Sequence, residues 1–317
     1  MECPAPVASL AYILWGLLVT ELYLAEWVAA GATLGFNYGV SSRVGVTLRA
    51  TPEQMVAGTL VRDPQLLMPH TGSTVSGSLL FGLSFGLPAA LCLLVNVLQA
   101  PLEGGRLGPR SLARGTRDVH HLMLAVLQAY ALATCWKIWL NVSVGRQRPD
   151  WYARIASGEE SLVHEGRMSY PSGHAAYSHT SGSCCFWYLA GRLGVLGSGL
   201  SADAQPARLQ FLRLLGAAMP VGLATFVATS RITDGVHHFS DVNAGTFLGL
   251  SCGTLCYHLH FHPFWTGGRV QHHCPRTRLE EGAATRAMPH KGPATPTEGA
   301  AQSSEEAGLI QLNTRQQ

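Results

Sequence analysis

Long apolar stretches alternate with short polar segments over most of the chain. An apolar helix of about 20 residues crosses the roughly 30 Å hydrocarbon core of a bilayer, and six windows of the sequence reach this length. They are Val7–Ala29, Ser76–Leu98, His121–Val144, Ala175–Leu196, Leu209–Thr229 and Val242–Phe261. The pattern predicts an all-α polytopic membrane protein with six transmembrane helices. Two acidic residues in the first window, Glu21 and Glu26, leave its limits open.

The apolar pattern stops after about Trp265. We therefore expect one membrane domain over residues 1–263 and a separate tail over residues 264–317. The tail is rich in Ala, Pro, Gly, Ser, Thr and Glu, a composition too polar to bury a core, so it is expected to be disordered.

Three polar clusters stand at the ends of the apolar windows. Gly145–Trp151 (GRQRPDW) follows the third window, Tyr170–His179 (YPSGHAAYSH) opens the fourth, and Ser230–Asp241 (SRITDGVHHFSD) joins the fifth to the sixth. Successive spans alternate in direction, so the loop between spans three and four and the loop between spans five and six emerge on the same side. The sequence predicts a helical-bundle active site at one membrane face.

Composition narrows the function. Only 13% of residues are charged, against about 25% in ordinary soluble domains, and the net charge of +3 is too small and too scattered to indicate a nucleic-acid partner. Eight cysteines lie mostly inside apolar windows and form neither a disulfide framework nor a CxxC zinc motif. They are interpreted as small buried residues.

The clusters carry the side chains of an anion site. Arg148 and Arg231 are permanently charged forks that suit phosphate oxygens, although arginines at membrane edges also serve as helix anchors. Ser172 and Gly173 lead into a helix whose N-terminal amides attract anions, although such a segment can also be a plain helix start. Four helix-edge features that converge on one side favour an anion site over independent anchors.

Histidines add catalytic chemistry to this anion site. His174 and His237 come from separate loops and can face a bound phosphate from two sides. Asp241 lies four residues after His237, where a carboxylate can orient an imidazole. Spacing alone does not separate His237 from His238. A zinc site of His and Asp ligands is disfavoured, because neighbouring guanidinium groups repel a cation.

The motifs resemble a known family. Arg148–Pro149, Pro171–His174 (PSGH) and Ser230–Asp241 (Ser-Arg-x5-His-x3-Asp) are similar to the three-part signature of the type 2 phosphatidate phosphatase superfamily. GRQRPD and HHFSDV resemble its integral-membrane lipid phosphate phosphatase branch, and the segment Arg62–His70 also fits. The likeness extends from about Val7 to Phe261.

The resemblance implies a role for each matching residue. His237 corresponds to the nucleophile that forms a phosphohistidine, Asp241 to its orienting partner, and His174 to the general acid. The phosphate-binding residues that it implies are Arg148, Ser172, Gly173 and Arg231. It implies no metal and no cofactor.

One position departs from the family pattern. The family places a lysine seven residues before the arginine of Arg-Pro, and this chain has Asn141 there. Lys137 lies one helical turn earlier on about the same face and is one of only two lysines in the chain. Lys137 and Asn141 are thus alternative candidates for the missing phosphate ligand.

We therefore expect an enzyme that hydrolyses lipid phosphate monoesters, with phosphatidate, lysophosphatidate, sphingoid-base phosphate or diacylglycerol pyrophosphate as the substrate class. The alternative is a catalytically weak or silent family member that binds phospholipid or scaffolds membrane partners. A transporter is disfavoured because repeats and broken helices are absent from the pattern. The expected location is the plasma membrane or an endomembrane such as the endoplasmic reticulum. The resemblance implies a lumenal or extracellular active site and a cytosolic tail, and a homo-oligomer is compatible with the sequence.

Overall fold

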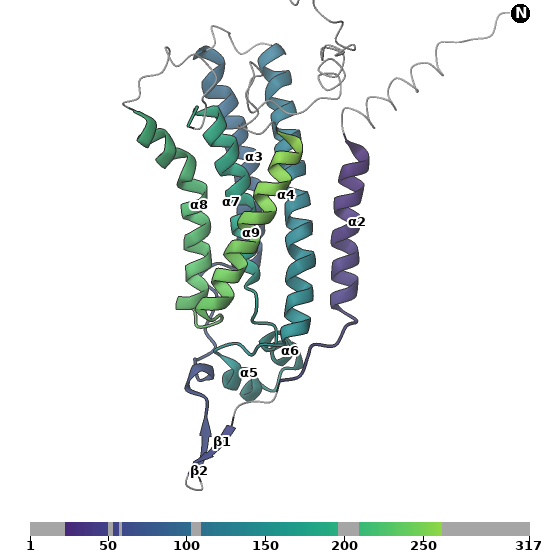
Figure 1. The fold of residues 1–317 in the computed structure, drawn as a ribbon, viewed down its shortest axis with the longest axis vertical. Helices are drawn as coiled ribbons and strands as arrows, with labels where there is room; N and C mark the ends of the chain where they lie inside the picture. Colours follow the sequence, from purple (N-terminus) through teal and green to yellow (C-terminus); the bar gives the residue numbers. More distant parts are fainter. Residues whose placement is uncertain (1–22, 50–52, 57–58, 103–108, 196–208, 262–317) are drawn as a thin grey trace, which may run out of the picture. The chain divides into compact units, whose positions relative to one another are not determined.

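The computed structural model describes residues 23–49, 53–56, 59–102, 109–195 and 209–261 of the chain, and the protein is mostly helical over these ranges. The structure has six long helices over these ranges (Figure 1). The last five of them fall on the second to sixth apolar windows. The long helices are α2 (Leu24–Ser41), α3 (Gly77–Leu102), α4 (Pro109–Val144), α7 (Gly173–Arg192), α8 (Gln210–Thr233) and α9 (Phe239–His260). The short elements are β1 (Glu53–Val56), β2 (Thr59–Arg62), η2 (Pro64–Leu66), α5 (Trp151–Ser157) and α6 (Glu160–Gly166).

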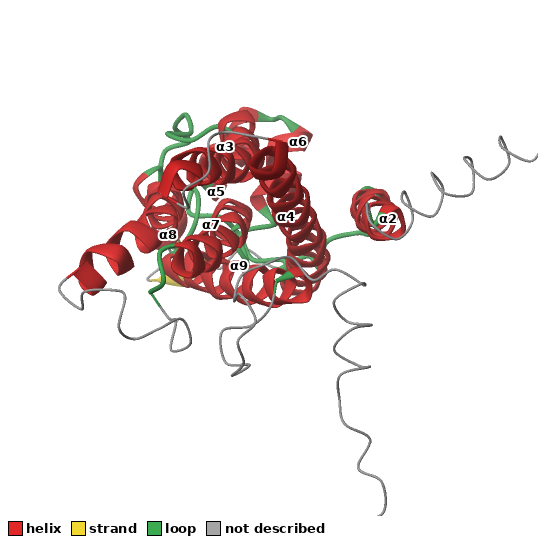
Figure 2. Cartoon of the chain, turned by 90° about the horizontal axis from the view of Figure 1, so that it is seen from above, coloured by secondary structure: helices red, strands yellow, loops and turns green. Residues whose placement is uncertain are grey.

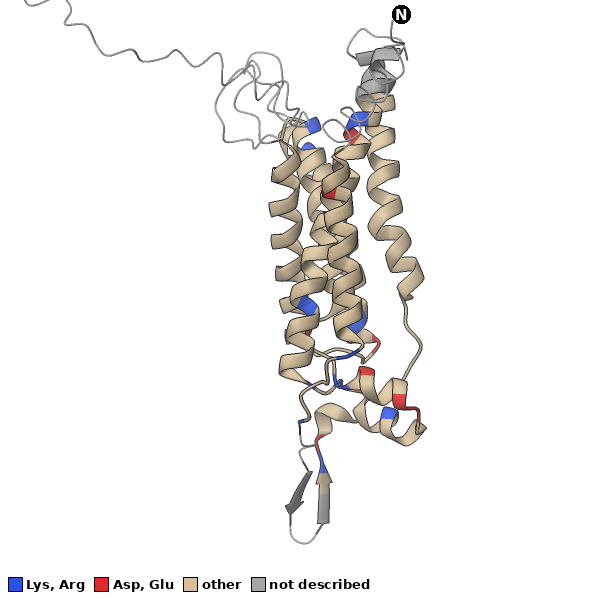
Figure 3. Cartoon of the chain, turned by 90° about the vertical axis from the view of Figure 1, so that its right-hand side faces the viewer, with Lys and Arg blue, Asp and Glu red and all other residues tan. Residues whose placement is uncertain are grey.

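Some of the long helices are apolar enough to cross a membrane. Within the described ranges, three helical segments are long and apolar enough to span a bilayer: Gly77–Leu98, Gly115–Val144 and Gln210–Thr233. Figure 3 shows that charged positions gather toward the two ends of the helices and leave the middle uncharged. The prediction of six spans therefore stands in part, and the remaining spans stay a prediction.

Helix α7 lies in the centre of the bundle and is not among the three apolar segments. It contacts α3, α4, α8 and α9, which surround it in Figure 2. Most of its side chains are buried, and hydroxyls such as that of Thr180 donate to a carbonyl one turn earlier, here Ala176 at 2.8 Å. A helix that is enclosed by protein does not need the lipid-facing composition on which a hydropathy window depends.

The first apolar window differs from its prediction. It was expected to end at Ala29, but α2 continues to Ser41, and residues 7–22 lie outside the described ranges. The carboxylate of Glu26 accepts a hydrogen bond from the Gln128 side chain of α4 at 2.8 Å. This exposed acidic residue is thus paired with α4 and does not mark a helix boundary.

A short hairpin departs from the predicted all-α class. Strands β1 and β2 pair antiparallel, with Glu53 opposite Arg62, between α2 and α3. The strands contain Val56, Thr59 and Val61, β-branched residues that favour extended backbone. The predicted tail, residues 264–317, lies outside the described ranges.

Three glycines bring α9 into close contact with α7. They are spaced four residues apart, so they share one face of α9, and a Cβ on them would lie 2.4, 2.2 and 2.5 Å from a backbone oxygen of α7. Any side chain there would collide with backbone, so only glycine allows this approach. The pairs are Gly245 with Ser172, Gly249 with Ala176, and Gly253 with Thr180.

The buried core lies where α4, α7 and α9 meet, and Tyr188, Tyr257 and Phe261 are its largest fully buried members. Six cysteines fall in the described ranges, all without a disulfide and five of them buried. Their interpretation as small buried residues is confirmed for five of the six, and Cys135 is partly exposed.

Candidate active site

The three polar clusters form one hydrogen-bonded unit. The Ser172 amide donates to the backbone carbonyl of Asp241 at 3.0 Å, and the Ser169 amide donates to the carbonyl of Arg146 at 2.9 Å. The close packing of Gly245 against Ser172 brings the starts of α7 and α9 within reach of these bonds. The segments that parity places on one side of the bundle are therefore in direct contact.

A cavity of about 520 Å³ opens between these segments. It is lined by backbone and side chains from α4, α7 and α8, by the loop before α5 and by the segment before α3. The predicted site residues on its wall are Lys137, Arg148, Gly173, His174, Arg231 and His237. Asn141, Ser172 and Asp241 are not on its wall, and all three are buried.

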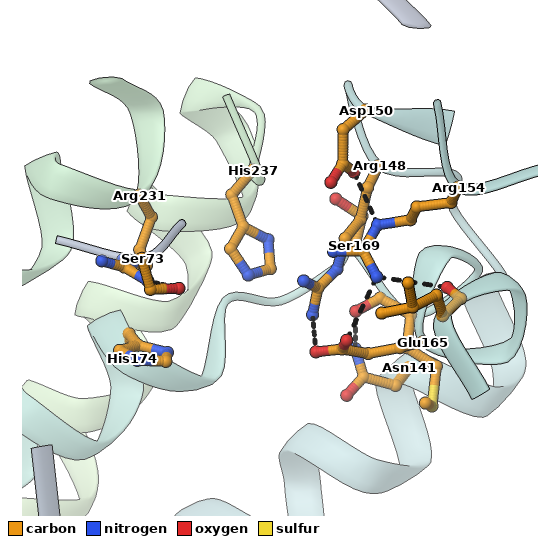
Figure 4. Close-up of polar contacts among 12 residues, drawn as sticks. Ser73, Asn141, Arg148, Asp150, Arg154, Glu165, Ser169, His174, Arg231 and His237 are labelled. Atoms are coloured by element: carbon orange, nitrogen blue, oxygen red, sulfur yellow. Dashed lines mark hydrogen bonds and ion pairs between the residues drawn. The ribbon is translucent and has the colours of Figure 1, made fainter. Parts of the chain in front are cut away.

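His237 lies in the loop between α8 and α9 with its ring at the cavity (Figure 4). Its Nδ1 is 3.7 Å from the nearer carboxylate oxygen of Asp241, which is beyond a normal hydrogen bond. Such contacts often tighten only when substrate is bound. Burial, assisted by the positive charge of Arg148 and opposed by Asp241, lowers the pKa of His237 to about 4. The imidazole is therefore neutral at physiological pH and has a lone pair available.

Asp241 is held by residues to which the sequence analysis gave no role. Its carboxylate accepts from Arg146 at 2.8 Å, from the Ser169 hydroxyl at 2.5 Å and from the amide of His238 at 3.0 Å. Arg146 lies in the GRQRPD motif, so the sequence could have indicated that it belongs to the site. Ser169 precedes the PSGH motif and carries no signal of its own, because its role depends on the contact between α7 and α9.

The structure separates the two adjacent histidines. His237 lines the cavity, whereas the His238 ring is hydrogen-bonded through Nε2 to the carbonyl of Gln147 at 3.1 Å. His238 is also the N-cap of α9, in a capping box with Asp241. His238 therefore stabilises the start of α9.

Arg148 lines the cavity in contact with an acidic residue that the sequence analysis did not single out. Its guanidinium is 3.0 Å from the carboxylate of Glu165 in α6, and that carboxylate also lies 3.1 Å from Arg154. Figure 4 shows Glu165 between the two arginines. Burial lowers the pKa of Arg148, and its Nε is a buried donor without a hydrogen-bond partner. The guanidinium of Arg148 can exchange its Glu165 partner for another anion, and its Nε has a free N–H to donate. Both properties suit the binding of an anionic ligand.

Arg231 stands on the opposite side of His237 from Arg148 (Figure 4). It is 1% exposed, pairs with Asp234 at 2.6 Å and donates to the Ser73 hydroxyl at 3.2 Å. Asp234 is further fixed by the backbone amide of Thr74 at 2.9 Å. The guanidinium is thus held rigidly at the cavity wall.

Lys137 and Asn141 occupy different environments. The Asn141 amide donates to the carbonyls of Met168 at 3.2 Å and Tyr170 at 2.8 Å, so it supports the backbone that leads into α7. Lys137 instead lines the cavity, and its Nζ is 3.9 Å from the position that a Cβ on Gly173 would take. Of the two candidates, only Lys137 has its side chain at the cavity.

The start of α7 carries the remaining predicted residues. Ser172 is the N-cap of the helix, and its hydroxyl is buried without a hydrogen-bond partner. His174 lines the cavity and is hydrogen-bonded through Nε2 to the carbonyl of Val75 at 3.1 Å. The site thus combines three cationic side chains and a helix N-terminus with two histidines, a set that can hold a phosphate dianion between a nucleophile and an acid.

Comparisons with known proteins support the resemblance that the motifs indicate. Residues 122–265 match the PAP2 superfamily. A PA-phosphatase related-family protein of Dictyostelium discoideum is 36% identical over 154 residues, which cover 48% of this chain and 54% of that protein. Lipid phosphate phosphatase 2 of Arabidopsis thaliana is 29% identical over 162 residues, 46% of this chain and 52% of that protein.

A longer match is found with phospholipid phosphatase 1 of Mus musculus, which is 26% identical over 233 residues, 66% of this chain and 76% of that protein. The alignments with the first two relatives span about half of the length of each. No solved structure matches the chain. Residues 122–265 therefore match the PAP2 superfamily, and the relatives named lipid phosphate phosphatase and phospholipid phosphatase agree with the branch that the motifs resemble.

Proposed function

We propose that the chain is an integral-membrane phosphatase that hydrolyses lipid phosphate monoesters through a phosphohistidine on His237. The observation that carries the proposal is the cavity shared by His237, His174 and three cationic side chains, Lys137, Arg148 and Arg231. Phosphoryl transfer depends mainly on positioning and on stabilisation of charge on the transferred oxygens. These five side chains supply both.

The first half of the reaction transfers the phosphoryl group to the protein. The free imidazole nitrogen of His237 attacks phosphorus, and the phosphorus–oxygen bond to the lipid alcohol breaks. The leaving alkoxide takes a proton from the imidazolium form of His174, which the negative charge of the bound phosphate favours, so a neutral lipid alcohol leaves and His174 becomes neutral. Arg148, Arg231 and Lys137 stabilise the equatorial oxygens, with help from the Gly173 amide at the start of α7.

The second half regenerates the enzyme. His174, now neutral, takes a proton from a water molecule as that water attacks the phosphohistidine. The phosphorus–nitrogen bond breaks, inorganic phosphate forms, and the His237 imidazole is restored. Asp241 orients His237 in both halves, and Arg146 and Ser169 hold Asp241 in turn.

The substrate class follows from the setting of the site. A lipid phosphate can place its headgroup in the cavity while its acyl chains stay in the bilayer beside α3 and α8, whose outward leucines and phenylalanines are exposed. We infer a lumenal or extracellular site in the plasma membrane or an endomembrane, with the tail on the cytosolic side. Substrates are phosphatidate, lysophosphatidate, sphingoid-base phosphates or diacylglycerol pyrophosphate.

The test is phosphate release by the purified protein in detergent micelles that contain each lipid phosphate. We expect release that persists in excess EDTA, because three cationic side chains replace a metal at the phosphate. His237→Ala protein, purified in the same way, is the control for a contaminating phosphatase. A wild-type preparation that binds lipid phosphates without releasing phosphate would support the alternative, a silent member of the family.

A further inference from the structure

The segment His70–Val75, between η2 and α3, contacts all three motifs of the site. Nδ1 of His70 is 2.6 Å from the carboxylate of Asp150, in the first motif. The carbonyl of Val75 is bonded to His174, in the second. The third motif donates from Arg231 to the hydroxyl of Ser73. One stretch of six residues therefore connects loops that lie far apart in the sequence.

Further hydrogen bonds fix this segment in place. Thr71 donates to the backbone carbonyl of Asp234 at 2.9 Å, and the hydroxyl of Thr74 donates to the Asp234 carboxylate at 2.5 Å. Just before the segment, the amide of Met68 donates to the carbonyl of Pro149 at 3.0 Å. The backbone is thus anchored at both ends, and it is positioned as firmly as the motif loops.

The same segment forms part of the cavity wall. His70, Thr71, Gly72 and Ser73 all line the cavity, and each is also exposed to solvent. The His70 side chain is 38% exposed. The segment therefore forms a rim at the mouth of the cavity, where the part of a substrate beyond the phosphate has to pass.

His70 presents one nitrogen to this mouth. The Asp150 carboxylate is fully buried, and its other oxygen accepts from Nε of Arg154 at 2.8 Å. A carboxylate paired with an arginine accepts hydrogen bonds, so His70 donates from Nδ1. Within the described ranges no hydrogen bond engages its Nε2, which leaves that nitrogen for a ligand.

The direction of the proposed reaction places the lipid alcohol next to this rim. In an in-line displacement the leaving oxygen lies opposite the nucleophile His237. The proposed proton donor to that oxygen is His174, which is bonded to Val75 of the rim. Resting on the function proposed above, we propose that His70–Val75 is a fourth part of the active site that binds the alcohol portion of the lipid phosphate. In this role Nε2 of His70 hydrogen-bonds an oxygen of that portion, and Gly72 leaves room for it.

A substitution at Gly72 can narrow the mouth of the cavity without disturbing the fold. A Cβ on Gly72 would have no protein atom within 4 Å, and its backbone is not in the left-handed region. A valine is therefore tolerated by the fold but occupies space at the cavity mouth. Gly82 in α3 is the matched control, because a Cβ there also meets nothing within 4 Å and the residue is not on the cavity wall.

Two substitutions of His70 separate ligand contact from support of the rim. In His70→Asn the amide nitrogen replaces Nδ1 and keeps the donor to Asp150, whereas the group at Nε2 is lost. In His70→Gln the amide nitrogen replaces Nε2 instead. Leu67→Ala is a control on the same stretch, since Leu67 is 52% exposed and does not line the cavity.

The experiment measures kcat/KM on micellar lysophosphatidate and the inhibition constant of orthovanadate, which mimics the phosphoryl group and has no alcohol portion. We expect His70→Asn to lower kcat/KM about fivefold, the effect of one lost hydrogen bond, and Gly72→Val to lower it about tenfold or more. His70→Gln should retain more activity than His70→Asn. The vanadate constant should stay within about twofold in all of these variants.

Each result has a definite meaning. If His70→Asn and Gly72→Val behave like Leu67→Ala and Gly82→Val on an active wild-type background, the inference is overturned and the proposed function stands. The inference is also overturned if vanadate inhibition weakens as much as turnover, because the segment then only supports the phosphate ligands. If wild-type protein binds vanadate but releases no phosphate from any lipid, the proposed function fails, and with it the inference.

Discussion

Nζ of Lys137 lies 3.9 Å from the position that a Cβ on Gly173 would take, at the N-terminus of α7. We therefore expect Lys137→Met to lower kcat/KM for a lipid phosphate about ten- to a hundredfold. Loss of a charge-assisted hydrogen bond to phosphate costs about 1.5–3 kcal/mol, and about 1.4 kcal/mol corresponds to a factor of ten. Steady-state kinetics on a short-chain phosphatidate measures this loss.

Asn141 provides the matched comparison for Lys137. Because its amide supports the carbonyls of Met168 and Tyr170, Asn141→Ala should lower the thermal stability of the protein as well as its activity. Lys137→Met should leave the unfolding temperature almost unchanged. A lysine placed at Asn141 in the Lys137→Met background should restore little activity, since it removes the same support. Substantial recovery in that double variant would show that the phosphate is reached from residue 141.

The adjacent histidines should respond differently to substitution. His237→Ala should abolish phosphate release, because the proposed nucleophile is lost and the phosphohistidine has no other site. His238→Ala removes the hydrogen bond to the Gln147 carbonyl and should lower stability by about 1 kcal/mol while turnover persists. Activity assays and thermal unfolding of both variants measure the two effects. Equal loss of turnover in the two would contradict the assignment of His237.

The low pKa of His237 predicts the pH dependence of the reaction. Burial lowers this pKa to about 4, from about 6.5 for an ordinary histidine, so the free imidazole persists in mildly acidic solution. The acidic limb of kcat/KM assigned to the nucleophile should therefore lie near pH 4. A limb near pH 6.5 that moves with substitutions around His237 would contradict this expectation.

The same shift has a consequence for stability with a definite sign. Between pH 6.5 and 4 the unfolded chain binds a proton at His237 that the folded protein excludes, so the free energy of unfolding falls as pH falls through this range. The full effect is about 3 kcal/mol. In His237→Asn, thermal stability should depend less on pH between 7 and 4 than it does in the wild type.

The contact between α7 and α9 can be tested at its centre. A Cβ on Gly249 would lie 2.2 Å from the carbonyl oxygen of Ala176, so Gly249→Ala has to push the two helices apart. We expect a loss of about 3 kcal/mol of stability and a lower unfolding temperature in detergent. Gly222→Ala is the control, because a Cβ there meets nothing within 4 Å and alanine favours a helix more than glycine does. A stable Gly249→Ala protein with full activity would contradict this account of the packing.

Much of the site could be predicted from local sequence. The windows for α3, α4, α7, α8 and α9 follow from apolar runs, and the motifs at their ends are short enough to be recognised individually. Parity of the spans then brings these ends together without any knowledge of packing. Arg148 and Arg231 were identified in this way, whereas the choice of His237 over His238 came from the family resemblance, and all three residues line the cavity.

The remaining features depend on contacts between distant segments. Glu165 and Ser169 belong to no motif, and each acquires its role from a partner elsewhere, Arg148 and Asp241 respectively. Lys137 and Asn141 lie one turn apart on α4, but only the Lys137 side chain faces the cavity, whereas Asn141 bonds to backbone. The partner of Glu26, the Gln128 side chain of α4, lies about a hundred residues away in the sequence. None of these follows from periodicity, because each is decided by tertiary packing.

The carboxylate of Glu165, which pairs with Arg148 and Arg154, competes with a phosphate for the Arg148 guanidinium. This carboxylate already neutralises the guanidinium to which we assign the phosphate, so in the proposed reaction a substrate binds by exchange of one anion for another. The exchange weakens ground-state affinity, but it also gives Arg148 a partner when inorganic phosphate departs. Under the proposed function, phosphate is therefore not held so tightly that the product blocks the next turnover.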